Sequence, residues 1–276
     1  MVQRFRSAKR VRKLVAWILG ILLFATVALV GMVVLPCLKD PTPRFVERRG
    51  RIVEAHETQR LNLGSTEFRE LTLVASSGLN LDISVRIPTP IDSPSPLVIL
   101  LGGYRTGRDA ARLVVDTRGV VVAALSYPYR GELAPRGIAL LTSIPKIQRA
   151  ILDTPPAVLL ALNYLLKQPY IDSERVELAG VSLGAFFVSV PGALDARIKR
   201  VWLVHGAGKP AEVLAHRLED HISWAPARSL AGRILGLLSY SHYLEPERWV
   251  GRVAPRPVIV VNARDDEALT PSSIES

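Results

Sequence analysis

The sequence predicts an α/β fold built on a mostly parallel, doubly wound sheet. Short apolar runs such as 97–101, 120–125 and 257–261 recur along the chain, as is typical of strands that are buried on both faces. Segments with helical patterns lie between these runs, and this alternation places parallel strands in one sheet. In addition, an alternating strand at 175–179 leads through a glycine-containing turn directly into an apolar helix.

The first 35 residues have a different character. Residues 14–35 are uncharged and almost wholly apolar, which is enough for a helix to cross about 30 Å of hydrocarbon. The basic tail 1–13 carries six cations: Arg4, Arg6, Lys9, Arg10, Arg12 and Lys13. No small-x-small cleavage site follows the apolar segment, so we expect an uncleaved signal-anchor, a single transmembrane helix. Because a tail with six cations is costly to translocate, we expect a cytoplasmic N-terminus and an external catalytic domain.

The next segments lead into the sheet. Residues 36–66 contain Pro41 and Pro43 and mixed charges without a clear period, and we expect a linker, with some helix near 53–60. The main domain is predicted over 67–276. Residues 68–75 and 79–87 alternate between apolar and polar and flank a turn, which predicts a β-hairpin.

The rest of the chain follows the strand–helix alternation. We expect further strands at 97–101, 120–125, 175–179, 198–204 and 257–261. We expect helices at 110–118, at 155–168 with proline in the first turn, and from Leu183 onward. Residues 133–151 show no clear pattern. Residues 209–252 interrupt the alternation and predict two or three short helices, which would form a small cap.

The turn before Leu183 carries the pattern G-x-S-x-G, with Gly180, Ser182 and Gly184 at its fixed positions. A strand, a tight turn, a serine and a helix make the geometry of a nucleophile elbow. The turn strains the serine backbone and brings strand and helix so close that the flanking positions must be small. The N-terminus of the helix directs its free N–H groups at any negative charge that forms beside the serine.

With this elbow, the chain resembles the α/β-hydrolase superfamily, especially its dienelactone-hydrolase and acyl-thioesterase-like branches. The resemblance runs from about residue 67 to the end. Besides the elbow, the run 100–104 (Leu-Leu-Gly-Gly-Tyr) is similar to the family's strand and His-Gly-x loop, with Gly102 in place of the histidine. The run 260–266 (Val-Val-Asn-Ala-Arg-Asp-Asp) is similar to the strand that delivers the acid of the catalytic triad.

The resemblance implies a role for each of these residues. Ser182 would be the nucleophile, and the backbone N–H groups of Leu183 and Tyr104 would form the oxyanion hole. Asp266 is our first choice for the triad acid because its distance to Pro271 fits the family's spacing, and Asp265 is the second. A turn that simply favours aspartate is the alternative for both.

The chain departs from the family pattern at the catalytic base. The family order is serine, acid and then histidine, but no histidine follows His242. The sequence could be a truncated or frameshifted copy, a non-catalytic relative, or a protein in which another histidine serves. His205 is the best substitute because it ends the strand expected beside that of Ser182. His216, His221 and His242 fall in the cap.

Composition limits the other functions. The net charge is +10, to which the N-terminal tail contributes six charges, so the remainder does not require nucleic acid as a partner. One cysteine excludes an internal disulfide framework, and we expect no metal site and no cofactor, including nucleotides. We therefore expect a membrane-anchored serine hydrolase that acts on a small-molecule ester or thioester. The alternatives are a non-catalytic binding domain and a serine peptidase. Tyr129 and Trp224 could line the substrate pocket of the expected hydrolase, although core or surface roles are commoner for such residues.

Overall fold

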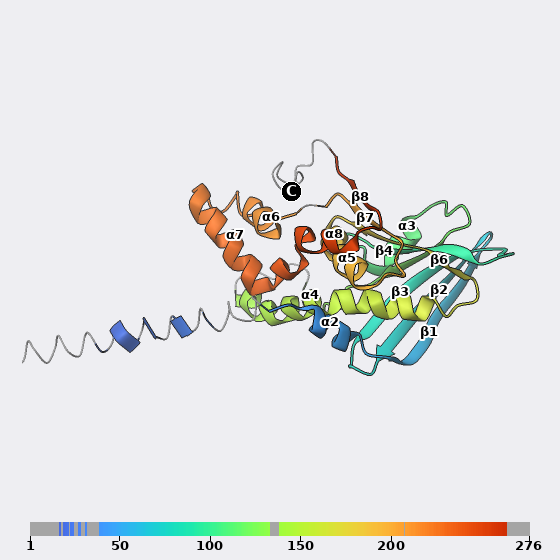
Figure 1. Cartoon of the computed structure of the whole chain (residues 1–276), viewed down its shortest axis with the longest axis horizontal. Coiled ribbons are helices and arrows are strands. Elements are labelled where there is room, and N and C mark those ends of the chain that lie inside the picture. The colour runs from blue at the N-terminus through green and yellow to red at the C-terminus, as the bar shows by residue number, and fades with distance from the viewer. Residues whose placement is uncertain are drawn as a thin grey trace, which may run out of the picture. The chain divides into compact units, whose positions relative to one another are not determined.

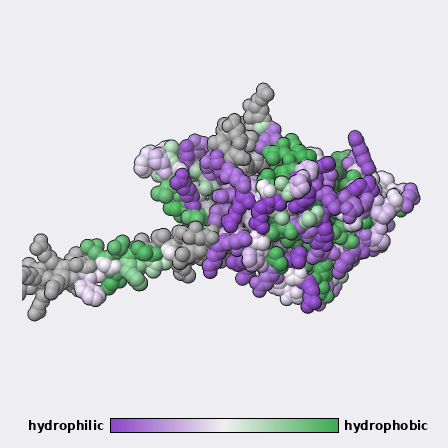
Figure 2. Space-filling model, viewed as in Figure 1, coloured by the Kyte–Doolittle hydropathy of each residue, from purple (hydrophilic) through white to green (hydrophobic). Residues whose placement is uncertain are grey.

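The structure is a computed structural model that describes residues 39–132, 138–206 and 208–263, together with scattered positions between 17 and 31. The chain divides into two compact units, Met1–Asp40 and Pro41–Ser276. The described positions between 17 and 31 are helical, and most of this stretch appears green in Figure 2. Most of the predicted anchor, 14–35, lies outside the described residues. Among the residues that are described, no helix is both long and apolar enough to cross a membrane.

In the second unit, the described residues form an eight-stranded sheet in the order β1-β2-β3-β5-β4-β6-β7-β8 (Figure 1). The strands are β1 Ile52–Leu63, β2 Thr66–Ala75, β3 Asn80–Pro88, β4 Ser95–Leu101, β5 Val121–Leu125, β6 Ile171–Val181, β7 Arg200–Val204 and β8 Val258–Val261. β1, β2, β3 and β5 pair antiparallel in turn, whereas β5, β4, β6, β7 and β8 run parallel. The predicted hairpin and the predicted mostly parallel sheet are therefore confirmed.

Strand β1 corrects the prediction for the segment before the hairpin. The structure has a helix, α2 (Thr42–Arg49), and a strand where the sequence predicts a linker over 36–66, and the helix expected near 53–60 is wrong. β1 is exposed along nearly its whole length, so no one-sided apolar pattern marks it as a strand. Its conformation depends on pairing with β2, which extends from Ile52 opposite Ala75 to Leu63 opposite Thr66 and shifts register twice, between Ile52 and Glu54 and between Glu57 and Gln59.

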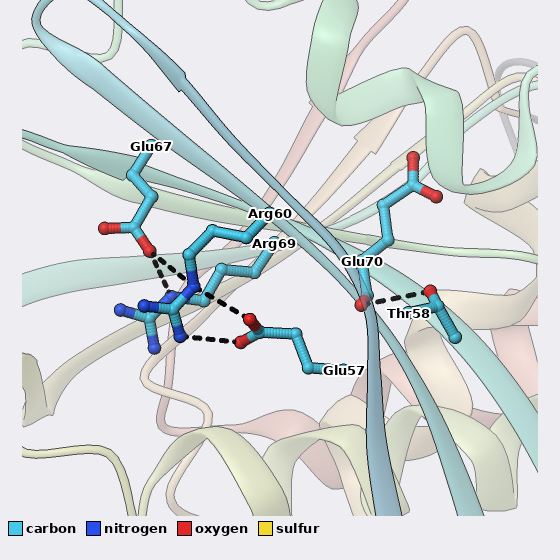
Figure 3. Close-up of polar contacts among 6 residues, drawn as sticks. All are labelled: Glu57, Thr58, Arg60, Glu67, Arg69 and Glu70. Carbon is cyan, nitrogen blue, oxygen red and sulfur yellow. Dashed lines mark hydrogen bonds and ion pairs between the residues drawn. The ribbon is translucent and has the colours of Figure 1, made fainter.

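Charged side chains reinforce this pairing (Figure 3). The guanidinium of Arg60 donates to both carboxylate oxygens of Glu57 on the same strand, at 2.7 and 2.9 Å. It also lies 3.5 Å from Glu67 on β2, which in turn accepts a hydrogen bond from Arg69. Opposite charges thus connect the two strands, as cross-strand ion pairs do in antiparallel sheets.

The helices are α2, α3 Ala110–Leu113, α4 Ile138–Leu165, α5 Leu183–Leu194, α6 Pro210–His216, α7 Ala225–Ser239 and α8 Pro246–Val253, with 3₁₀ turns η1 Gly107–Asp109 and η2 Ser241–Leu244. The predicted helix at 110–118 is shorter than expected and ends at Leu113. Over 209–252, the predicted group of short helices is confirmed. In Figure 1, α6 and α7 lie together at one end of the sheet.

Helix α4 is longer than the sequence predicts. We expected a helix to begin at Pro155, but α4 continues from Ile138 with Pro145, Pro155 and Pro156 inside it. An internal proline removes a backbone hydrogen bond and costs about 3 kcal/mol. The segment of α4 after these prolines is largely buried, with Leu159, Leu160 and Leu162 at 1% exposure or less. Burial of that apolar face against the sheet offsets the cost of the prolines.

Candidate active site

Ser182 occupies a strained turn between β6 and α5. Its backbone has φ 54° and ψ −115°, a conformation that residues other than glycine rarely adopt. Its N–H donates to the carbonyl of Val204 at the end of β7, at 2.8 Å. The strand, turn and helix predicted around Ser182 are therefore confirmed, and the hydroxyl is presented at an exposed position. Strain of this kind persists only where the surrounding structure enforces it.

The two glycines of the motif allow the strand and the helix to approach each other. A Cβ on Gly180 would lie 2.7 Å from the backbone nitrogen of Ala185 and closer still to the carbonyl of Gly184. A Cβ on Gly184 would collide with the backbone of Leu101 on β4. Both positions therefore exclude any side chain, for the steric reason that the motif predicts.

The sheet register brings the other predicted site residues beside Ser182. Val181 lies opposite Val204, so Ser182 and His205 follow neighbouring strands at the same edge of the sheet. Leu101 lies opposite Gly180, so the loop after β4 approaches from the other side. A Cβ placed on Gly103 would be 3.8 Å from the Cβ of Ser182. In a parallel sheet, this carboxyl edge is where functional groups collect.

These residues open onto one pocket of about 1060 Å³, whose wall includes Tyr104, Ser182, Leu183 and His205. The structure thus brings together four of the predicted site residues. The far wall comes from α4, α6 and η2, so part of the segment predicted as a cap does border the pocket. Tyr129 also lines it, whereas Trp224 is 69% exposed at the start of α7 and is absent from the wall.

The backbone around Ser182 supplies hydrogen-bond donors. Leu183 is the first residue of α5, and the first N–H groups of a helix have no acceptor within it. Tyr104 belongs to a turn that is closed by Thr106. The hydroxyl and the backbone N–H of Thr106 both donate to the carbonyl of Gly103, at 3.1 and 3.2 Å. A loop that is fixed in this way holds the N–H of Tyr104 in a constant position, as an oxyanion hole requires.

Sequence reasoning missed the contribution of Tyr127 to this loop. Tyr127 follows β5, and its hydroxyl donates a short hydrogen bond to the carbonyl of Gly102. Its ring packs against Phe187 of α5, with 5.5 Å between the centroids. Burial raises the pKa of Tyr127 well above its ordinary value, so the hydroxyl stays protonated and remains a donor. The only signal in the sequence was its place directly after a buried strand.

His205 is also fixed by neighbouring strands. Its backbone has φ 49°, and its N–H donates to the carbonyl of Val261 at 2.7 Å. The next N–H, that of Gly206, donates to the side chain of Asn262 at 3.0 Å. Asn262 directly follows β8 and therefore closes the turn that positions His205. The predicted acids Asp265 and Asp266 lie outside the described residues.

The other histidines lie elsewhere. His216, the last residue of α6, contacts Glu219 at 3.1 Å, and the rings of His242 and Tyr243 pack at a tilt of 42° with 4.2 Å between their centroids. Burial lowers the pKa of His242. His56 lies on β1, which belongs to the sheet, and contacts Glu54 at 2.8 Å. Within the parts of the chain that the structure describes, no group of three or more metal-binding side chains comes together.

The sheet order, the elbow and the pocket at its carboxyl edge define the α/β-hydrolase fold, and comparison with solved structures agrees. Acetyl xylan esterase from Paenibacillus sp. R4 superimposes with a TM-score of 0.59 at 15% identity, covering 82% of this chain and 87% of that chain. Acetyl xylan esterase 1 from Thermoanaerobacterium sp. superimposes with a TM-score of 0.57 at 16% identity, covering 86% of this chain and 82% of that chain. A glucuronoyl esterase from Solibacter usitatus superimposes with a TM-score of 0.53 at 16% identity, covering 85% of this chain and 76% of that chain.

At these identities the likeness establishes the fold alone. No protein-family model and no curated protein matches the sequence.

Proposed function

We propose that this protein hydrolyses carboxylic esters through a covalent acyl-Ser182 intermediate. The observation that carries the proposal is the strained backbone of Ser182, with φ 54°, at the wall of a large pocket. A serine in this conformation projects its hydroxyl away from the sheet and sits beside unpaired N–H groups of a helix terminus. The solved structures of similar fold that are named as esterases support ester chemistry rather than another use of the fold.

The chemistry takes two steps. The Oγ of Ser182 attacks the ester carbonyl while a base takes its proton, and the N–H groups of Leu183 and Tyr104 stabilise the oxyanion. The C–O bond to the alcohol then breaks, and the alcohol leaves with the proton from the base. In the second step, water loses a proton to the same base and attacks the acyl-serine. The carboxylic acid departs, and Ser182 recovers its proton.

We infer that His205 is the base. It follows β7, the neighbour of the strand that carries Ser182, and both side chains belong to the same pocket wall. Asp266, or else Asp265, is our proposal for the acid that orients it. Both come a few residues after β8, which is paired with β7. The role of each remains a proposal that substitution can test.

Hydrolysis of p-nitrophenyl butyrate by the full chain and its variants tests the mechanism. We expect Ser182→Ala to lower kcat/KM by at least about 10³-fold, because the substitution removes the attacking oxygen. The matched control is Ser189→Ala on the same helix. Ser189 is fully buried and its hydroxyl has no hydrogen-bond partner, so its removal leaves activity unchanged. Turnover that survives in Ser182→Ala would contradict the mechanism, and a folded wild type without turnover would favour a binding domain.

We also propose that residues 14–35 anchor the protein in a membrane, with the basic tail in the cytoplasm and the hydrolase domain outside. The proposal is supported by the uncharged, apolar sequence of this segment and by the six cations before it. After expression in a bacterial host, we expect the protein to stay in the membrane fraction through alkaline carbonate extraction. Replacing Leu22, Phe24 and Val27 by aspartate should release it, and extraction of the unaltered chain by carbonate would contradict the anchor.

A further inference from the structure

The wall of the pocket beyond Ser182 is apolar. Immediately after the serine, Leu183 and Phe186 of α5 continue the surface. Opposite them, side chains of α4, α6 and η2 close the space, and the larger apolar members of this wall are Ile147, Ile151, Pro210, Val213, Leu214 and Leu244. The cap is held over α4 by Gln148, whose amide donates to the carbonyl of Leu238 on α7 at 2.7 Å. Most of the pocket wall between the nucleophile and the cap is therefore apolar.

Most hydroxyl groups of the pocket wall already donate to the protein, and apart from Ser182 those of Tyr104 and Ser126 are the exceptions among the described residues. Thr154 donates to the carbonyl of Ala150 at 2.7 Å, and Ser239 and Ser241 both donate to Gly236. Near Ser182, the hydroxyls of Thr106, Tyr127 and Tyr129 also donate to backbone carbonyls. A sugar ring needs convergent donors and acceptors, because its buried hydroxyls would otherwise lose their hydrogen bonds to water.

The charged members of the wall lie toward solvent. Arg105, Asp109 and Arg217 are exposed, and Arg108 pairs with Glu70 of β2 at 3.2 Å. The interior therefore offers apolar contact, and charge is confined to exposed positions and to an ion pair. A volume of about 1060 Å³ is at the upper end of the range for small-molecule sites and far exceeds what an acetyl group fills.

We propose that the acyl group of the substrate is an unbranched aliphatic chain of six or more carbons, bound between α5 and the cap. The inference rests on the proposed hydrolysis, since it assigns the acyl group to the apolar surface that begins at Ser182. The acyl group is the part of the ester that remains bonded to Ser182 in the intermediate. It must therefore occupy the space next to Leu183 and Phe186 during both steps.

The first test is a chain-length series of p-nitrophenyl esters, from acetate to decanoate, each kept below its critical micelle concentration. Each methylene that becomes fully buried raises kcat/KM about fourfold. Allowing for incomplete burial, we expect kcat/KM to rise at least about 30-fold from butyrate to octanoate. Turnover of short esters that depends on Ser182, without a rise along the series, would overturn this inference and leave the proposed function intact. A preference for acetylated xylan over octanoate would also overturn it.

A second test narrows the pocket. Leu214 is partly exposed on α6, so Leu214→Trp should fill space next to the chain without disturbing the core. We expect the ratio of kcat/KM for octanoate to that for butyrate to fall at least about tenfold. The control is Leu230→Trp on α7, which is 60% exposed and does not belong to the pocket wall. Should the tryptophan variant fail to fold, Leu214→Asn tests the contact with the acyl chain by making this part of the wall polar.

Calorimetric binding of octanoate and butyrate keeps the inference testable without turnover. We expect octanoate to bind more tightly than butyrate, and Leu214→Trp to abolish the difference. If no ester is hydrolysed but octanoate binds in this way, the proposed function fails and the pocket assignment stands. Equal binding of the two acids would overturn the assignment whatever the activity.

Discussion

At the scale of single residues, the site depends on space as much as on chemistry. Ser182 can hold φ 54° only because β6 and α5 meet at two glycines, where a Cβ would overlap the backbone. Local sequence predicts this feature well, since the motif, the alternating strand and the apolar helix are contiguous. It cannot predict the hydrogen bond from Tyr127 to Gly102, because the two residues belong to different strand ends that become neighbours only in the folded sheet.

Substitution of Gly180 tests the steric argument. We expect Gly180→Ala to lower the free energy of unfolding by about 2 kcal/mol and to abolish ester hydrolysis, because the methyl group forces α5 away from β6. The measurement is urea unfolding followed by circular dichroism.

The matched control for that substitution is Gly251→Ala on α8, where a Cβ meets nothing within 4 Å. This change should be neutral or stabilising by about 0.5 kcal/mol, because glycine is unfavourable within a helix. If Gly180→Ala and Gly251→Ala had equal effects on stability, the close contact between β6 and α5 would not be the reason for glycine at position 180.

At the scale of elements, ion pairs join segments that are distant in sequence. Arg48 of α2 binds both carboxylate oxygens of Asp153 on α4, at 2.7 and 2.9 Å, and also donates to the carbonyl of Ser77. Asp153 is only 6% exposed. The hydrogen bond and the charge of Asp153 raise the pKa of Arg48 despite its partial burial. This contact fixes α2 against the helix whose other residues border the pocket.

Removal of Arg48 should leave a buried carboxylate without its partner. We expect Arg48→Met to lower the free energy of unfolding by about 2 kcal/mol, below the usual cost for a fully buried pair because Arg48 is partly exposed. Lys199→Met, which breaks an exposed pair with Glu174, should change it by less than about 0.5 kcal/mol. Equal urea midpoints for the two variants would refute the claim that the ion pair of Arg48 stabilises the fold more than the exposed pair of Lys199.

The loop between α5 and β7 gives a prediction about pH. Burial alone would raise the pKa of Asp195, but hydrogen bonds from the side chain and backbone of Arg197 outweigh it, so the pKa lies below its ordinary value. The native carboxylate therefore contributes stability above the unfolded pKa of about 4, and this contribution is lost as pH falls through the lower folded pKa. Arg197 also binds Asn163 of α4, so the loop is tied to a helix of the core.

We accordingly expect Asp195→Asn to be destabilising at pH 7 and to approach the stability of the wild type near pH 3. Thermal unfolding at a series of pH values measures the difference. A difference that stays constant from pH 7 to pH 3 would show that Asp195 does not contribute through its charge.

At the scale of the whole molecule, segments with a periodic apolar pattern were predictable, whereas segments that depend on a distant partner were not. The hairpin and the buried parallel strands follow from the alternating and continuous apolar residues in the sequence. β1 is exposed along its length and exists because β2 lies beside it, and α4 extends through three prolines because its far end is buried. Ser182 was evident from its motif, and the predicted place of His205 at the end of the neighbouring strand is confirmed by the pairing of β6 with β7.

The central claim is that Ser182 is an activated nucleophile, and covalent labelling tests it most directly. The full chain would be treated with a fluorophosphonate and its intact mass measured, beside Ser182→Ala and the control Ser189→Ala. We predict one adduct on the wild type and on Ser189→Ala, and none on Ser182→Ala. Labelling that persists without Ser182, or its absence from a folded wild type, would contradict the claim.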